Sequence, residues 1–358
     1  MATKFLFSGL YFRKLEALRR VADLAEQRDD VASSVEYLYL GKFGDIKEAL
    51  IHRDEITPWM QEMRRLVRLL PNLIALQGSA YKTQNGVLSE LTVSHSTPPF
   101  VTLRSLSVGA DNLAAVVGLV DRASPTLVRL GLHDRPDSAS PGTINLRPST
   151  YPSSVLPRLH TLMLDMLGPA SCLMHQLAAQ WTLPSLNTVT SFASLHLLAF
   201  LGVHGEKVVQ LGLLGQAAAD LASYHGCLTR CPNLRVLALQ VSRPTDVRKS
   251  AILTIDAPIT SVETINISQG SVERSPSNAD EIDPYVPELV TKANFPALVR
   301  VRFSSHLYYI SKRSAGSLPI NTPLPSADPP PSVCPNLPDS LIPWFRALTE
   351  QGVEVEWT

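Results

Sequence analysis

The chain has 358 residues, more than the roughly 100–200 of a typical single core, which suggests two domains or one elongated repeat array. Apolar residues make up 45% of the chain and charged residues 18%, so it can bury a core and is not expected to be disordered. Its 32 Lys and Arg balance 32 Asp and Glu, which leaves no net field to attract nucleic acid or an anionic membrane and argues against both as main partners.

The first 30 residues predict a helix that caps the fold. An apolar segment, Phe5–Phe12, is followed at once by Arg13 and Lys14 without a small-residue cleavage site, so we do not interpret it as a secretory signal. Apolar side chains then recur at helical spacing: Leu15, Leu18, Val21 and Ala25. We expect this helix to cover the first strand and bury its open edge.

From residue 31 to residue 303 one six-residue phrase recurs, with apolar residues at positions 1, 4 and 6, as in VEYLYL, LVRLGL and LRVLAL. Position 1 falls at Val35, Leu73, Leu103, Leu127, Leu159, Leu186, Val208, Leu234, Val262 and Leu298. Position 4 is apolar in all ten copies, and at position 6 only Gly78 and Ser191 break the rule. Two residues before position 1, six of the ten copies carry proline: Pro71, Pro125, Pro157, Pro184, Pro232 and Pro296. With 28 prolines in 358 residues, about one would be expected there by chance.

This phrase predicts a ladder of short parallel strands. Proline cannot continue a helix or donate to a ladder, so it separates one element from the strand that follows. Positions 4 and 6 have the same parity and therefore point to one face of a strand. The copies are 22 to 38 residues apart, which leaves room for one helix and two loops between strands. We therefore predict an α/β fold, a leucine-rich-repeat-like solenoid whose parallel strand ladder lines the concave face and is backed by helices.

Helical patterns fill several of the gaps between copies. Thr57-Pro58 is typical of an N-cap and a first helical position, and it precedes Met60, Met63, Val67 and Leu70. Asp111 is placed to cap a second helix, lined by Leu113, Val116, Val117 and Val120. A third helix is predicted from Leu173, Leu177 and Trp181. The longest later apolar stretch, Leu195–Val203, is far shorter than the roughly 20 residues of a membrane helix.

The end of the chain predicts a loop and a second cap. Residues 304–342 carry eight prolines between Pro319 and Pro338, so we expect an extended, mobile loop. Residues 343–358 then predict a helix to Glu350, closed by Gly352, and a strand in which Val353, Val355 and Trp357 alternate with glutamates.

The repeat style is similar to that of a known family. CPNLRVLAL (231–239), LPRLHTLML (156–164) and FPALVRVRF (295–303), alternating with short apolar helices, resemble the irregular leucine-rich-repeat region of fungal F-box-type proteins. The resemblance covers roughly residues 31–358. It implies repeats that recognise a substrate for a cullin-type ubiquitin ligase, with an N-terminal F-box that docks on the ligase adaptor. No F-box is visible, since residues 1–30 are short and lack its Leu-Pro opening.

No motif for catalysis, cofactor binding or metal binding was found in the sequence. Four cysteines are too few for a disulfide framework and indicate the reducing cytoplasm or nucleus. Cys227 and Cys231, near His225, have no second ligand pair, so we expect buried thiols and no metal. His133 and the other histidines have no Ser or Cys partner within a motif, although a nucleophilic site can assemble across the sequence.

We therefore expect a monomeric scaffold that binds another protein, not an enzyme, and that requires no cofactor. Positions 3 and 5 point away from the core, and there the ladder offers aromatic, polar and Arg side chains of the kind that dominate interfaces. The candidate partner-binding residues are Tyr37, Tyr39, Gln77, Ser105, Arg129, Met163, Gln210, Asn266, Arg300 and Arg302. The alternative is an enzyme of unknown class whose site is built from loops at the strand ends.

Overall fold

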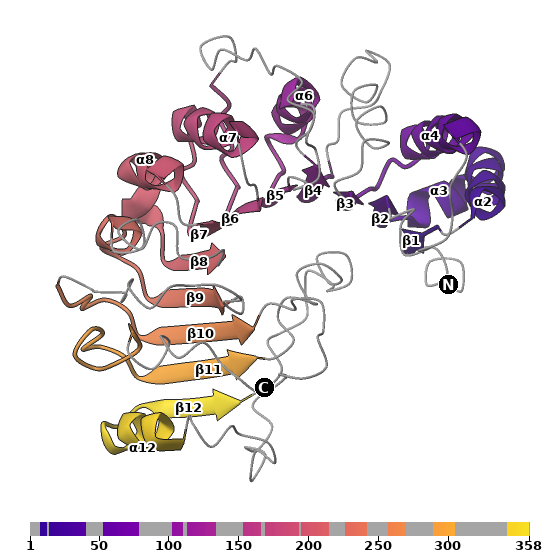
Figure 1. Cartoon of the computed structure of the whole chain (residues 1–358). Coiled ribbons are helices and arrows are strands. Elements are labelled where there is room, and N and C mark those ends of the chain that lie inside the picture. Colours follow the sequence, from indigo (N-terminus) through magenta and orange to yellow (C-terminus); the bar gives the residue numbers. More distant parts are fainter. Residues whose placement is uncertain are drawn as a thin grey trace. The chain divides into compact units, whose positions relative to one another are not determined.

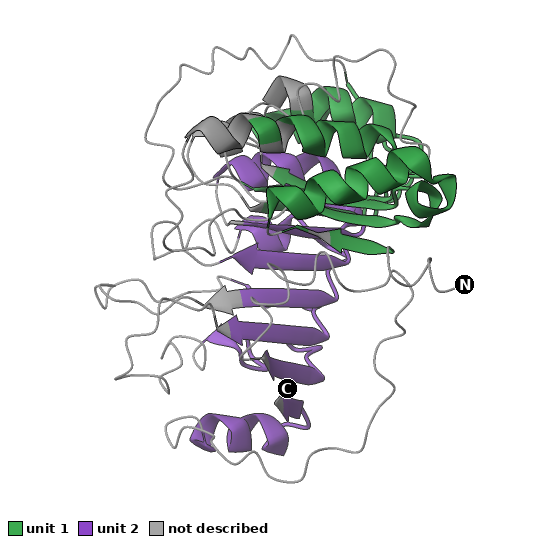
Figure 2. Ribbon diagram, turned by 90° about the vertical axis from the view of Figure 1, so that its right-hand side faces the viewer, with its two compact units in different colours: residues 1–186 green, residues 187–358 purple. Residues whose placement is uncertain are grey.

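In the computed structural model (Figure 1), the described residues are 8–12, 14–40, 53–78, 102–109, 113–133, 153–165, 169–192, 195–214, 226–241, 257–269, 289–304 and 342–357. The chain divides into two compact units, residues 1–186 and 187–358 (Figure 2). In both units the described strands pair in parallel, and their order in the sheet is their order in the chain.

Unit 1 contains strands β1 to β6 with helices on one side of them (Figure 1). The strands are β1 (Gly9–Tyr11), β2 (Tyr37–Leu40), β3 (Ala75–Gly78), β4 (Ser105–Gly109), β5 (Arg129–His133) and β6 (Thr161–Asp165). The helices are α2 (Leu15–Gln27), α3 (Asp29–Ser34), α4 (Arg53–Arg68), α6 (Leu113–Ala123) and α7 (Pro169–Gln180).

Unit 2 contains strands β7 to β12. They are β7 (Thr188–Phe192), β8 (Gln210–Leu214), β9 (Val236–Val241), β10 (Thr264–Gln269), β11 (Arg300–Ser304) and β12 (Glu354–Trp357). The helical segments are α8 (Leu195–His204), the 3-10 turn η2 (Gly205–Lys207) and α12 (Ile342–Glu350). Phe303 of β11 contacts both Trp344 and Phe345 of α12 edge-on, with ring centroids 5.5 and 5.2 Å apart, so α12 covers the apolar side of this ladder.

The prediction of an α/β fold with helix-backed parallel strands is confirmed. All ten predicted strands are present, and each begins at position 3 of its phrase. The residues at positions 1 and 4 are buried in every copy, as Leu159 and Leu162 illustrate at 0% exposure each. At position 6 every described side chain is buried too, including the exceptional Ser191. The three apolar positions of the phrase therefore form the core.

The recurring proline has a specific place in a turn. In four of the copies with proline, the amide of position 1 donates to the carbonyl three residues earlier, as in Leu234 to Cys231 at 3.0 Å and Leu298 to Phe295 at 3.0 Å. Proline follows that carbonyl directly, at the turn position where its fixed φ is favourable. In five of the six copies with proline the residue before it is buried, so the turn inserts one more side chain into the core. Such residues are Leu70, Leu156, Leu183, Cys231 and Phe295.

Two hydrogen-bond patterns recur where strands begin, one made by the backbone and one by side chains. The carbonyl of position 2 accepts the amides of both positions 2 and 3 of the next copy, as Arg104 accepts Val128 and Arg129 at 2.8 and 2.9 Å. The side chain just before position 1 donates to the preceding copy, as Asn233 does to Glu206 O at 2.7 Å. Asn72, Thr102 and Ser185 make the same bond to the equivalent carbonyl in their own preceding copies. Seven of ten copies have Ser, Thr or Asn there, a polar ladder that the sequence reading missed.

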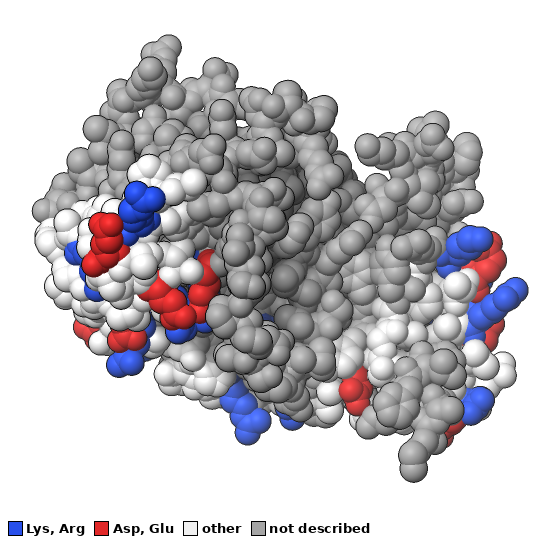
Figure 3. Space-filling model, turned by 90° about the horizontal axis from the view of Figure 1, so that it is seen from below, with Lys and Arg blue, Asp and Glu red and all other residues white. Residues whose placement is uncertain are grey.

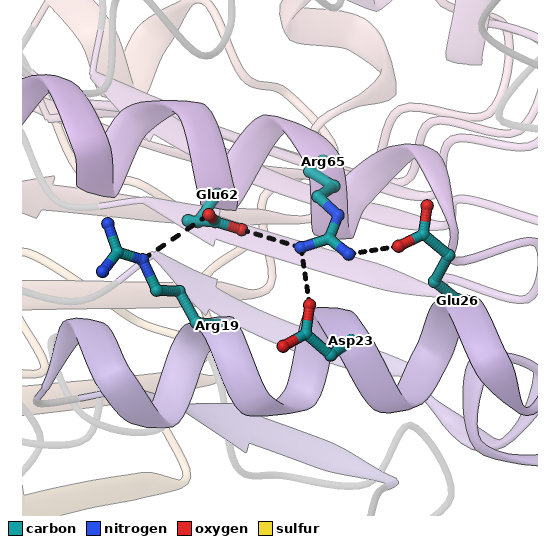
Figure 4. Close-up of polar contacts among 5 residues, drawn as sticks. All are labelled: Arg19, Asp23, Glu26, Glu62 and Arg65. Carbon is teal, nitrogen blue, oxygen red and sulfur yellow. Dashed lines mark hydrogen bonds and ion pairs between the residues drawn. The ribbon is translucent and has the colours of Figure 1, made fainter.

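A strand, and not the N-terminal helix, lies along the edge of the first predicted strand. Strand β1 pairs beside β2, in the register Gly9 to Tyr37 and Tyr11 to Tyr39, and so it occupies the edge that the helix was expected to cover. Helix α2 forms where predicted but packs beside α4. There Arg65 of α4 bonds Asp23 at 2.8 Å and also Glu26, while Glu62 bonds Arg65 and Arg19 (Figure 4).

The helix start predicted at Thr57-Pro58 is wrong, because α4 begins at Arg53 and holds Pro58 inside it. Proline removes one amide donor near the N-terminal end, a loss that the rest of a 16-residue helix can outweigh. At the C-terminus, α12 and β12 occupy the predicted segments, and Gly352 between them has φ 76°, the left-handed conformation that favours glycine. Of the predicted proline-rich loop, Ser304 belongs to β11 and Ile342 to α12, whereas residues 305–341 lie outside the described residues, as does Asp111.

Candidate functional site

The side chains at positions 3 and 5 form a separate surface in each unit, which we call the strand face. It lies opposite the buried positions 4 and 6. Position 3 is mostly half-buried or exposed, whereas position 5 is more enclosed and carries Gln77, Ser107, Gly131 and Gly212 as buried residues.

The structure places all ten predicted partner-binding residues on the strand face. Arg129 and Gln210 are exposed and Gln77 is buried, while the others are half-buried: Tyr37, Tyr39, Ser105, Met163, Asn266, Arg300 and Arg302. In unit 1 the ladder register puts Tyr39 beside Gln77. In unit 2 it puts Asn266 beside Arg302.

The two arginines of unit 2 are engaged within the ladder. Arg300 contacts Glu354 at 2.7 Å and Glu356 at 3.3 Å, and Arg302 contacts Glu356 at 2.5 Å. The hydrogen bond to Glu354 raises the pKa of Arg300. Since β12 supplies a carboxylate for each guanidinium, this end of the strand face carries a neutralised network and not two free cations. The sequence showed alternating glutamates in the last strand but not their register against β11.

Unit 1 also contains a Ser–His pair that the sequence did not predict. Ser107 Oγ lies 2.7 Å from His133 Nε2. Ser107 is at position 5 of β4, and His133 is the last residue of β5, one residue beyond its phrase. Gly131 of β5 pairs with Ser107 in the register and lies two residues before His133. The sequence held one weak indication of this pair, because a residue as small as Gly131 at position 5 leaves space for two side chains to meet across it.

Gln77, on the other side of Ser107 in the register, has an unusual environment. The residue is 8% exposed, and its Oε1 has no hydrogen-bond partner. A buried polar atom without a partner costs about 1–3 kcal/mol. An atom of this kind next to a Ser–His pair identifies the position 5 row of unit 1 as the most chemically distinctive part of the described surface.

The cysteines belong to the core. Cys227 and Cys231 are both free and both 0% exposed. Cys231 occupies the turn position where other copies have Leu or Phe, and burial raises the pKa of its thiol to about 12. Within the described residues, no three His, Cys, Asp or Glu side chains gather closely enough to hold a metal ion.

Lys and Arg are interspersed with Asp and Glu on the surface that Figure 3 presents, and the described residues there form no patch of a single sign. No helix in the described part of the chain is both long and apolar enough to cross a membrane. No protein-family model matches the chain, and no curated protein matches its sequence.

Proposed function

We propose that the chain is a scaffold that binds another protein through its strand face. The observation that carries this proposal is the asymmetry of the ladder. Parallel sheets are ordinarily covered by apolar packing on both faces. Here positions 4 and 6 are buried as expected, but the opposite face presents Tyr37, Tyr39, Arg129 and other polar or aromatic residues that remain half-buried or exposed. Tyr and Arg in such a setting are the residues that most often dominate binding energy.

The partner surface is expected to be mixed in polarity and not strongly charged. The face in unit 1 combines tyrosines, Ser105, Thr161 and Met163 with a single exposed Arg129. In unit 2, Arg300 and Arg302 are neutralised by β12. Binding to such a surface depends on shape and hydrogen bonding more than on long-range attraction, so its association rate should depend weakly on salt.

The finer proposal is that this ladder is leucine-rich-repeat-like and acts in the cytoplasm or nucleus to recognise a substrate for a cullin-type ubiquitin ligase. Support comes from the repeat rhythm, from the proline turn and from one strand per repeat. The polar side chains before position 1 serve the purpose that a buried side-chain ladder serves in a regular solenoid, since they bond four of the repeats to the one before.

The proposal can be tested with paired surface variants in unit 1. Tyr39→Ala with Arg129→Ala removes an aromatic and a cationic residue from the strand face. Leu24→Ala with Arg158→Ala is the matched control, because it removes a comparable apolar and cationic area from exposed residues elsewhere in the same unit. Partners captured by the wild-type chain would be identified by cross-linking mass spectrometry. The strand-face variant should lose them roughly tenfold or more; equal retention by both variants would contradict the proposal.

A further inference from the structure

The Ser107–His133 pair has the geometry of a serine with its general base. The two side chains come from neighbouring strands, and Ser107 Oγ lies 2.7 Å from His133 Nε2. When the other ring nitrogen carries the proton, the serine hydroxyl donates to Nε2, which is the arrangement that activates a serine nucleophile. Ser107 is 8% exposed and His133 is half-buried. A reacting group there would be largely shielded from water, which strengthens polar interactions.

Gly131 makes this contact possible. It lies beside Ser107 in the register and two residues before His133 on the same strand. A Cβ at Gly131 would lie 3.1 Å from Ser107 Oγ and 3.3 Å from His133 Nε2, so it would crowd both reacting atoms. On its other side in the register, β6 has the large side chain of Met163 at the same position. The missing side chain therefore falls where the pair meets.

Gln77 supplies a second, independent observation. Its side chain is on the strand next to Ser107, is more than nine-tenths buried, and has one polar atom without a partner. The amide oxygen and nitrogen of glutamine are interchangeable by rotation of the group, so either can be presented to a ligand. With its N–H₂ presented, Gln77 could stabilise an oxyanion formed next to Ser107.

We infer that Ser107 is an acyl-accepting nucleophile with His133 as its base, and that the site takes a small, activated carboxylic ester. This inference goes beyond the scaffold function and does not depend on it. It also departs from the sequence-based expectation that the chain is not an enzyme.

The step is balanced without any further reactant except water. Ser107 Oγ forms a bond to the ester carbonyl carbon while its proton passes to His133 Nε2. The bond from that carbon to the leaving oxygen breaks, and the leaving alkoxide takes the proton from His133. Water then attacks the acyl-serine with His133 again accepting a proton, and the carboxylic acid departs as Ser107 regains its hydrogen.

The test uses an alkyl fluorophosphonate on the intact chain, with intact mass and peptide mapping to locate the adduct. Ser107→Ala should abolish the label. Ser105→Ala is the matched control, because Ser105 lies on the same strand and the same face, two residues earlier. His133→Gln retains a polar side chain but no base, so labelling should slow at least about 100-fold. Gly131→Ala keeps both Ser107 and His133 in the sequence but pushes their side chains apart. It should slow labelling roughly 10- to 100-fold.

A purely structural hydrogen bond would give a different result. If the bond only held the two strands together, His133→Gln would label at the same rate as the wild-type chain, whereas loss of a general base slows labelling without unfolding the protein. Circular dichroism of each variant confirms that it is folded. Absence of label at Ser107 in the folded wild-type chain, or equal rates in wild type and His133→Gln, would overturn the inference.

Discussion

Alanine should strongly destabilise the protein at one of two glycines three residues apart in unit 2 and have little effect at the other. Gly205 is buried, and an added Cβ would lie 2.1 Å from the backbone oxygen of Arg230 and 2.9 Å from its carbonyl carbon. That oxygen belongs to the residue before Cys231, which is 0% exposed, so the backbone cannot move without disturbing the core. Gly202 lies exposed in helix α8, and its added Cβ would meet the end of the flexible Arg230 side chain at 3.0 Å.

The magnitudes follow from these contacts. An approach almost 1 Å inside the closest real Cβ contact should place Gly205→Ala at the upper end of overpacking costs, about 3 kcal/mol. Gly202→Ala should gain up to about 1 kcal/mol of helix propensity. Moving the Arg230 guanidinium from the Leu198 carbonyl should offset roughly 0.5–1 kcal/mol of that gain, so the net change should be small.

Urea unfolding followed by circular dichroism measures both changes. With a slope of about 2 kcal/mol per molar, Gly205→Ala should lower the midpoint by roughly 1.5 M, and Gly202→Ala should leave it nearly unchanged. Equal destabilisation by the two variants would show that the end of α8 is sensitive to any side chain. Stability of Gly205→Ala within about 0.5 kcal/mol of the wild type would refute the contact itself.

Three further predictions concern the thiol, the ion pairs and the polar ladder. Because burial raises the folded-state pKa of Cys231 to about 12, above its unfolded value, its contribution to stability should be complete below about pH 8.5 and be lost as pH rises toward 12. Cys231→Val should flatten this dependence in unfolding experiments, and an unchanged slope would contradict it. Arg65→Met should cost about 1 kcal/mol at low salt and less at 1 M salt, since its three carboxylate partners lie at the surface. Asn233→Ala should cost about 1 kcal/mol of stability through its lost bond to Glu206 O. Lys207→Ala changes the equivalent residue of the preceding copy and should cost less.

The ladder could be predicted because one short phrase carries most of the information. Apolar residues at positions 4 and 6 define a face by parity alone, and the preceding proline defines where the strand begins. Strand β1 was missed although Phe7, Leu10 and Phe12 fit the same phrase. We had considered this segment only as a secretory signal, which the charged residues just after it argued against. The helix boundary at Pro58 was missed because local preference at one residue was outweighed by the rest of α4.

The chemistry of the site could not be predicted in the same way. The Arg300–Glu354 pair joins residues 54 apart, and the Ser107–His133 contact joins residues 26 apart. Both depend on the register between strands, and the second also depends on a diagonal contact across a glycine. A phrase that repeats at irregular spacing fixes which residues face outward, but not which outward residues become neighbours.

The first strand provides a final test of the ladder. Removing residues 1–12 should expose the edge of β2, because Ser8 O accepts the amides of Glu36 and Tyr37 at 3.0 and 2.9 Å and β1 pairs along Tyr37–Tyr39. It also removes Phe12, which is 7% exposed. The loss should be about 2–5 kcal/mol, the range for truncating a large core side chain.

An unpaired parallel edge with Tyr37 and Tyr39 beside it is a template for pairing with another chain. The truncated protein should therefore self-associate in light-scattering chromatography under conditions where the full chain is monomeric. Removing residues 1–7 is the control, because it shortens the chain but leaves Ser8 and β1 in place. A truncated chain that stayed monomeric with unchanged stability would mean that β1 is not needed to close the ladder.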